Sequence, residues 1–123
     1  SIDNHEIFKR SEENLYYELP ISFADAALGT SVEVPSIDGG KSKIKIPSGT
    51  QHGKQFRLKG KGMPILRRSI FGDLYIRIIT QVPTSLSKRQ KEILEEFNVI
   101  EGSKPDPIIK SFFEKAKKFW KNS

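Results

Sequence analysis

Apolar and polar residues alternate strictly along two stretches in the first half of the chain, LYYELPI and KSKIKIP. A period of two places one side of a β-strand against a core and the other side in water. The alternation assigns these side chains to the inner faces: Leu15, Tyr17, Leu19 and Ile21 in the first stretch, and Ile44 and Ile46 in the second. Both stretches are therefore predicted to be half-buried strands.

Three further stretches, SVEVPS, QFRLKG and DLYIRIITQV, are also predicted to be strands, and turn signals such as Asp38-Gly39-Gly40 separate the strands. One short helix is predicted at SFADAALG, where Ser22 can cap the first turn and Gly29 can end the last. Short strands at this spacing favour an antiparallel β-sandwich. We therefore predict a mainly β fold over residues 1–84, a small two-layer antiparallel β-sandwich with one short helix.

The apolar period becomes helical after Pro83. SKRQKEILEEF begins with Ser87 and Gln90 at the spacing of a capping box, and IIKSFFEKAKKFW follows Asp106 as N-cap and Pro107 as the first helical residue. Each helix carries an apolar stripe: Ile93, Leu94 and Phe97 in the first, and Ile109, Phe112, Phe113, Ala116 and Trp120 in the second. Residues 85–123 are therefore predicted to form a C-terminal helical segment.

The composition excludes several classes of protein. The chain has 123 residues and no cysteine, so we expect one domain, or one domain plus an appendage, with no disulfide framework, thiol nucleophile or thiolate zinc site. No apolar run approaches the roughly 20 residues that a membrane span needs. We expect a cytoplasmic protein without membrane contact, and the start at Ser1, inside a strand-like pattern, predicts a fragment of a longer protein.

The net charge of +6 is unevenly distributed. Residues 41–72 carry nine basic residues and no acidic one, whereas residues 1–40 carry two bases and eight acids. An anionic partner would therefore meet residues 41–72 first, or the tail at 103–123, which carries six bases and two acids.

The basic, glycine-rich stretch GTQHGKQFRLKGKGMP allows three interpretations. A Walker phosphate loop needs a Ser or Thr after GK and a helix behind it, and this stretch has strand-like residues on both sides. A basic β-domain that binds nucleic acid non-specifically is the stronger alternative. Base stacking needs exposed aromatic residues, however, and Phe56 is predicted to face away from Arg57 and Lys59. The pattern favours glycine-punctuated strand ends with a solvated basic face, so nucleic acid is disfavoured as a partner.

The two histidines, His5 and His52, have no neighbouring Ser, Asp or Glu arranged as nucleophile and orienter, and no local cluster of metal ligands. We therefore expect no catalytic residue, no cofactor, no metal site and no enzymatic activity.

The aromatic residues of the tail could fold back on their own β-domain or form a subunit interface. Burial of a large aromatic side chain is worth roughly 1.5–3 kcal/mol, so an exposed set would be a liability. The apolar stripe follows a complete sandwich and a flexible GSKPDP linker, which favours a homodimer. The predicted interface residues are Ile93, Leu94, Phe97, Ile109, Phe112, Phe113, Phe119 and Trp120.

Over essentially its whole length, the chain resembles the C-terminal part of the bacterial DnaJ family of J-domain co-chaperones. The segments that carry the resemblance follow in the family's order and spacing: LYYELPISFADAALGTSVEVPSIDG, KIKIPSGTQHGKQFRLKGKGMP, GDLYIRI, LSKRQKEILEEF and KSFFEKAKKFW. The resemblance implies the second C-terminal β-domain of the family, followed by its dimerisation segment. It leaves the role of the Ile70-Phe71 loop tip open.

The resemblance also implies the partners. The parent protein would deliver unfolded client polypeptides to a DnaK-type chaperone through parts that this sequence lacks, namely the J-domain, the Gly/Phe linker and the CxxCxGxG repeats. Zinc is expected only in that cysteine-rich region of the parent, and no cofactor is expected in this fragment.

Client binding by the β-domain itself has two interpretations. Family members hold non-native polypeptides mainly in an apolar groove of their first C-terminal β-domain. By analogy, a weaker site here could add the client as an extra strand beside SVEVPS and KIKIP. The alternative, that these are ordinary core residues, is favoured by the burial preference of valine. The candidate client-binding residues are Val32, Val34, Ile44 and Ile46.

Overall fold

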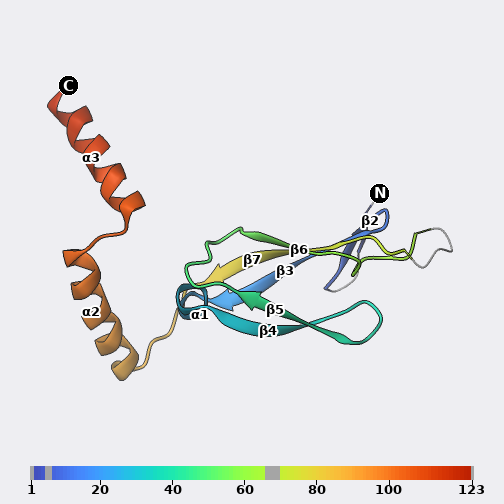
Figure 1. Ribbon diagram of the computed structural model, residues 1–123. Coiled ribbons are helices and arrows are strands. Elements are labelled where there is room, and N and C mark those ends of the chain that lie inside the picture. The colour runs from blue at the N-terminus through green and yellow to red at the C-terminus, as the bar shows by residue number, and fades with distance from the viewer. Residues whose placement is uncertain (1, 5–6, 66–69, 123) are drawn as a thin grey trace. The chain divides into compact units, whose positions relative to one another are not determined.

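The computed structural model describes residues 2–4, 7–65 and 70–122, the first three by their backbone alone. The chain forms two compact units, Ser1–Pro83 and Thr84–Ser123. Within the described residues the first unit contains the strands and one helix, and the second contains two helices (Figure 1). The elements in chain order are β1 (Ile2–Asn4), β2 (Lys9–Ser11), β3 (Asn14–Ser22), α1 (Phe23–Leu28), β4 (Thr30–Pro35), β5 (Lys41–Ile46), β6 (Gln55–Leu58), β7 (Leu74–Gln81), α2 (Lys88–Ser103) and α3 (Pro107–Lys121).

The strands of the first unit form two sheets. The larger sheet has the order β1-β2-β3-β7-β6, and β4 pairs with β5 in the smaller sheet. Neighbouring strands are antiparallel except β3 and β7, which run parallel. The prediction of wholly antiparallel pairing is therefore wrong at this pair. The alternation of a strand decides which face is buried and carries no information about the direction of its neighbour.

The β3–β7 pair forms the centre of the larger sheet. Its register sets Leu15 opposite Leu74 and Tyr17 opposite Ile76, so the inward residues of both strands share one face. Leu74, Ile76 and Ile78 have no exposed surface. The burial of Leu15, Tyr17 and Ile21 confirms the inner face predicted for β3, and β7 shows the same alternation.

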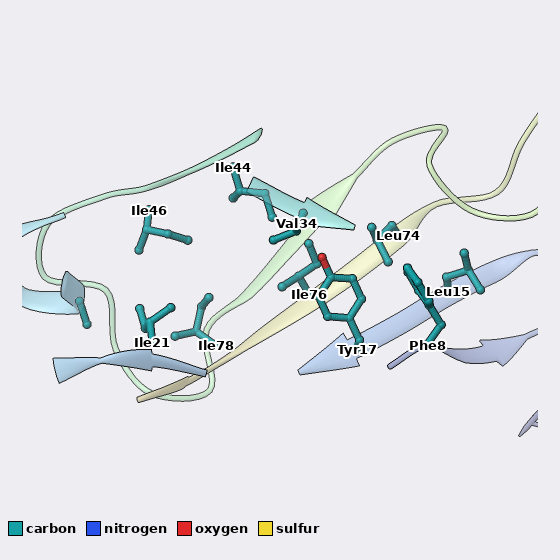
Figure 2. Close-up of a cluster of buried hydrophobic side chains, with 11 residues drawn as sticks. Phe8, Leu15, Tyr17, Ile21, Val34, Ile44, Ile46, Leu74, Ile76 and Ile78 are labelled. Atoms are coloured by element: carbon teal, nitrogen blue, oxygen red, sulfur yellow. The ribbon is translucent and has the colours of Figure 1, made fainter. Parts of the chain in front are cut away.

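The smaller sheet covers that face. Val34, Ile44 and Ile46 point from β4 and β5 toward the side chains of β3 and β7 (Figure 2). The fold class, a small β-sandwich with one short helix and C-terminal helices, is confirmed. The buried hydrophobic core consists of Phe8, Leu15, Tyr17, Ile21, Ala26, Val34, Ile44, Ile46, Leu74, Ile76 and Ile78.

Helix α1 closes one end of the sandwich. The Ser22 hydroxyl accepts a hydrogen bond from the Asp25 amide at 3.1 Å, which confirms the predicted N-cap. After the helix the chain turns at Gly29, where φ is +85° and a Cβ would lie 2.9 Å from the Ser48 amide nitrogen. The Gly49 amide donates to the Ala26 carbonyl at 2.9 Å, so the turn after β5 is tied to α1.

A close backbone junction fixes the opposite end. The Met63 amide donates a hydrogen bond to the Glu13 carbonyl at 2.7 Å. The Gly62 amide donates to the Gly72 carbonyl, and the Gly72 amide donates to the Met63 carbonyl, both at 2.8 Å. A Cβ on Gly72 would come within 2.1 Å of the Glu13 carbonyl oxygen, and one on Gly62 within 2.5 Å of the same atom. Both glycines are therefore required by the close approach of three chain segments.

The helices of the second unit begin as predicted. Ser87 and Gln90 form a reciprocal capping box on α2, and Asp106 caps α3 with Pro107 in its first turn. No residue of either helix is buried. Among the described helices of the chain, none is both long and apolar enough to cross a membrane.

The Tyr17 hydroxyl is a polar group inside the apolar core. Tyr17 is 5% exposed and its ring packs edge-on against Phe8, with ring centroids 5.3 Å apart. Among the described residues its hydroxyl oxygen has no hydrogen-bond partner. Burial raises the pKa of Tyr17 from 10.0 to about 12, because the charged phenolate would lose its solvation.

We expect Tyr17→Phe to raise the free energy of unfolding by about 1 kcal/mol at pH 7, because the variant removes a buried group without a partner. Because the pKa of Tyr17 is raised in the folded state, the full stability is present below pH 10, where the phenol is protonated in both states. As the pH rises from 10 toward about 12, the unfolded state loses its proton first and the free energy of unfolding falls. Urea denaturation at pH 7, 10 and 12, at fixed protein concentration, should show the alkaline loss reduced in the variant. An identical alkaline loss in both proteins would contradict this assignment.

We expect Gly72→Ala to lower the free energy of unfolding by about 3 kcal/mol, because its Cβ would meet backbone atoms of Glu13 that cannot rotate away. Gly40→Ala is the matched control in the same unit, since its nearest neighbour is the exposed Asp38 carboxylate at 3.2 Å. The control should cost less than about 0.5 kcal/mol. Equal losses for the two variants in urea denaturation would show that the junction is not tightly packed.

Candidate functional site

The apolar face of α3 gathers several of the exposed large hydrophobic side chains of the described residues. Five predicted interface residues of α3 are each more than half exposed: Ile109, Phe112, Phe113, Phe119 and Trp120. They follow the i, i+3, i+4, i+7 spacing of one helix face. Adjacent rings of Phe112 and Phe113 meet edge to face, with centroids 5.2 Å apart. The helix therefore presents a ready-made aromatic surface.

The face of α2 is smaller and less aromatic. Ile93 and Phe97 are about half exposed, and Leu94 is half-buried. The sequence analysis missed Ile108, which is 74% exposed at the start of α3. Its spacing of four residues before Phe112 is the signal that could have identified it. We therefore add Ile108 to the candidate interface residues.

The charges of α3 lie on the other side of the helix. Lys118 and Lys121 occupy the last turn, where a positive charge interacts favourably with the helix dipole. Because successive residues of an α-helix are rotated by about 100°, Ser111 and Lys118 lie opposite the aromatic face. Helix α3 is thus amphipathic, with one apolar face and one solvated face.

The candidate client-binding residues lie mostly inside the sandwich. Val34, Ile44 and Ile46 are buried core residues, and Val32 is half-buried. In the closed sandwich the inward side chains of this sheet are covered by the larger sheet. Contact between these side chains and a client remains a prediction.

The glycine-rich basic stretch is built into the fold. Gly49, Gly53 and Gly60 adopt positive φ values of 79°, 87° and 75°, which are turn conformations suited to glycine. Between Gly53 and Gly60 the chain forms the edge strand β6, and Gly62 enters the junction with Glu13. The glycines of this stretch therefore have an architectural role.

The Asp73 carboxylate holds the basic stretch at Arg57 and Gly60. One carboxylate oxygen, Oδ2, accepts a hydrogen bond from Nε of Arg57 at 2.7 Å and forms an ion pair with its Nη2, also at 2.7 Å. The other, Oδ1, accepts from the Gly60 amide at 3.0 Å. The Gly60 amide and then the Arg57 guanidinium hold the pKa of Asp73 below its ordinary value, because they stabilise the carboxylate. Arg57 is thus largely neutralised by its partner.

A pair of tyrosines on the outer face of the larger sheet was missed by the sequence analysis. The rings of Tyr16 and Tyr75 stack with centroids 5.1 Å apart, on cross-strand neighbours of β3 and β7. They line a shallow hollow of about 470 Å³ together with Lys9 and Arg77. Their signal was an aromatic residue at a polar-face position in each strand, which buried alternation alone does not explain.

His52 Nδ1 accepts a hydrogen bond from the Thr80 amide at 3.0 Å, which ties its loop to β7. His5 lies outside the described residues. Within the described part of the chain, no group of three or more His, Cys, Asp or Glu side chains could hold a metal ion. Ile70 and Phe71 are about half exposed, and Phe71 bridges to Pro64.

Comparison with known proteins finds two family models that together cover most of the chain. Residues 1–83 match the family described as "DnaJ C terminal domain", and residues 89–122 match "Chaperone protein DnaJ C-terminal region". The division between the two matches falls between β7 and α2.

Curated relatives agree with these matches. A "Chaperone protein DnaJ" from Pelagibacter ubique (strain HTCC1062) is 64% identical over 122 residues, which is 99% of this chain and 32% of that protein. The proteins of the same name from Brucella canis and Brucella suis are 50% identical over 120 residues, 98% of this chain and 32% of theirs. The chain spans about a third of the length of these relatives.

Proposed function

We propose a function for this chain from the premise that it belongs to the DnaJ family of chaperones, as that family's C-terminal region. The chain would hold two copies of its parent together and contribute to holding client polypeptides. The parent would act as a non-enzymatic co-chaperone in the cytoplasm and deliver unfolded clients to a DnaK-type chaperone. Neither role requires covalent chemistry from the described residues.

One observation carries the dimer proposal, the solvent exposure of the apolar face of α3. Isolated helices of 15 residues are marginal in water, and most helical stability in proteins comes from packing of an apolar face. Exposed aromatic side chains on one face also invite association. A second copy of the same helix offers the same face, and a two-fold interface is self-complementary by symmetry. These points support a homodimer through α2 and α3.

Dimerisation gives the client-holding role its strength. When two weak client-binding arms are joined, the second binding event becomes intramolecular and its effective concentration reaches the millimolar range for short linkers. Avidity then rises without any new contact. The proposal assigns no cofactor to these residues, because the chain contains no cysteine to supply the thiolate ligands of the zinc-binding repeats.

The test is sedimentation of residues 1–123 over a concentration series at physiological salt. We expect a species of about twice the 14.0 kDa chain mass. Phe112→Asp/Phe113→Asp should weaken the dimer at least about a hundredfold, because four buried aromatic side chains are lost per dimer, each worth roughly 1.5–3 kcal/mol. Phe112→Ala/Phe113→Ala should act in the same direction while keeping a good helix former at both positions.

Ser111→Asp/Lys118→Gln is the matched control, because it changes the net charge by the same amount on the opposite side of α3. The control should remain dimeric. A chain that is monomeric at all concentrations, or aromatic variants that dimerise as well as the control, would overturn the proposed interface.

A further inference from the structure

Five basic side chains gather around one hollow at the edge of the sandwich. The hollow has a volume of about 350 Å³, and none of its lining residues is acidic. The bases come from two strands of different sheets and from the turn after one of them: Lys41 and Lys43 from β5, Arg57 from β6, and Lys59 and Lys61 from the turn. Bases of β5 and bases of β6 and its turn, at least 14 positions apart in the sequence, therefore form one positive surface.

Most of this charge is not neutralised within the described chain. Arg57 is held by Asp73 through two contacts of 2.7 Å. Lys41 lies 3.7 Å from Glu33, but both side chains are well exposed, so the pair is weak. For the ammonium groups of Lys43, Lys59 and Lys61, the described residues offer no carboxylate within salt-bridge distance. Lys59 is attracted to the Asp73 carboxylate at longer range, but Arg57 already holds that carboxylate. Three positive charges without a salt bridge therefore face the hollow.

Both strands that line the hollow are the last strand of their sheet. Among the strands that the structure describes, β5 pairs with β4 alone and β6 with β7 alone. Each therefore has an edge whose backbone amide and carbonyl groups are available to another extended chain. Lysines on such edges discourage pairing with a second basic or neutral strand, whereas the same lysines attract a strand that carries carboxylates.

The hollow suits a polypeptide better than a nucleic acid. Its two remaining lining residues are Ser42 and Leu58, so no aromatic side chain is available for base stacking. The stacked Tyr16 and Tyr75 line a different hollow. Backbone hydrogen-bonding groups and a half-buried leucine are instead the features that an extended peptide uses.

We propose that this basic hollow binds an acidic, extended segment of a client polypeptide, with its carboxylates against Lys43, Lys59 and Lys61 and its backbone along a free edge of β5 or β6. The proposal rests on the proposed function in one respect, that the bound segment belongs to a client.

The test is fluorescence anisotropy of residues 1–123 with a labelled 12-residue peptide in which Glu alternates with Val and Thr. We expect binding at low salt that weakens as salt is added, because exposed charges are screened. Lys43→Glu/Lys59→Glu should weaken binding at least tenfold. Lys45→Glu/Lys54→Glu reverses the same number of charges on β5 and just before β6, outside the hollow, and should weaken binding less than threefold.

Three results would overturn the inference. Equal losses in the two double variants would mean that net charge alone attracts the peptide. Equal binding of the peptide with Gln in place of Glu would mean that carboxylates are not recognised. Displacement of the peptide by a single-stranded oligonucleotide of equal charge, at lower concentration, would mean that the surface is a nucleic-acid site. Lys43→Gln/Lys59→Gln provides a milder variant, which should fall between the wild type and the double reversal.

The same samples separate this inference from the proposed function. A dimer by sedimentation that fails to bind the acidic peptide overturns the inference and leaves the dimer proposal intact. A monomer that binds the peptide, with the loss confined to Lys43→Glu/Lys59→Glu, supports the hollow and contradicts the dimer.

Discussion

The parallel pairing of β3 with β7 is the constraint on which the sandwich depends. It is the longest pairing in the larger sheet, from Leu15 opposite Leu74 to Ser22 opposite Gln81. Because the inward residues of both strands share one face, the pair supplies most of the apolar surface that β4 and β5 cover. The close backbone junction at Glu13, Gly62 and Gly72 lies at one end of this pair, and helix α1 lies at the other.

The two units differ in how far their apolar side chains are buried. The β-unit buries its inward side chains almost completely and leaves a charged outer surface, including the basic hollow at its edge. The helical unit has well-formed caps and amphipathic helices but no buried residue. Local signals are therefore sufficient to define α2 and α3, whose apolar side chains stay exposed. The two units thus present two kinds of exposed surface, one basic and one apolar.

Local features of the fold were predictable from the sequence because they depend on neighbours within a few positions. The alternation in LYYELPI and KSKIKIP identified the buried faces, and Ser87 with Gln90 identified the start of α2. The direction of β3 relative to β7 was not predictable, because side-chain periodicity is the same in parallel and antiparallel sheets. The antiparallel prediction failed there for that reason.

The surfaces were only partly predictable. The aromatic stripe of α3 follows from helical spacing. The predicted stripe began at Ile109 and so left out Ile108, the residue before it. The basic hollow needs Lys43 and Lys59 to meet across two sheets, which no local pattern specifies. The unpartnered hydroxyl of Tyr17 likewise depends on what surrounds it in the core. Burial of Val34, Ile44 and Ile46 shows that alternation identifies inward residues better than it identifies contacts with other molecules.

The connection between the units has a mechanical consequence. Unit 2 follows β7, so a pull on the helices enters the sheet through a strand that has neighbours on both sides. A pull along β7 loads its hydrogen bonds to β3 and β6 together in shear, whereas a strand at the end of a sheet is held from one side alone. Tension on the helices therefore enters the sheet through a strand that is held on both sides.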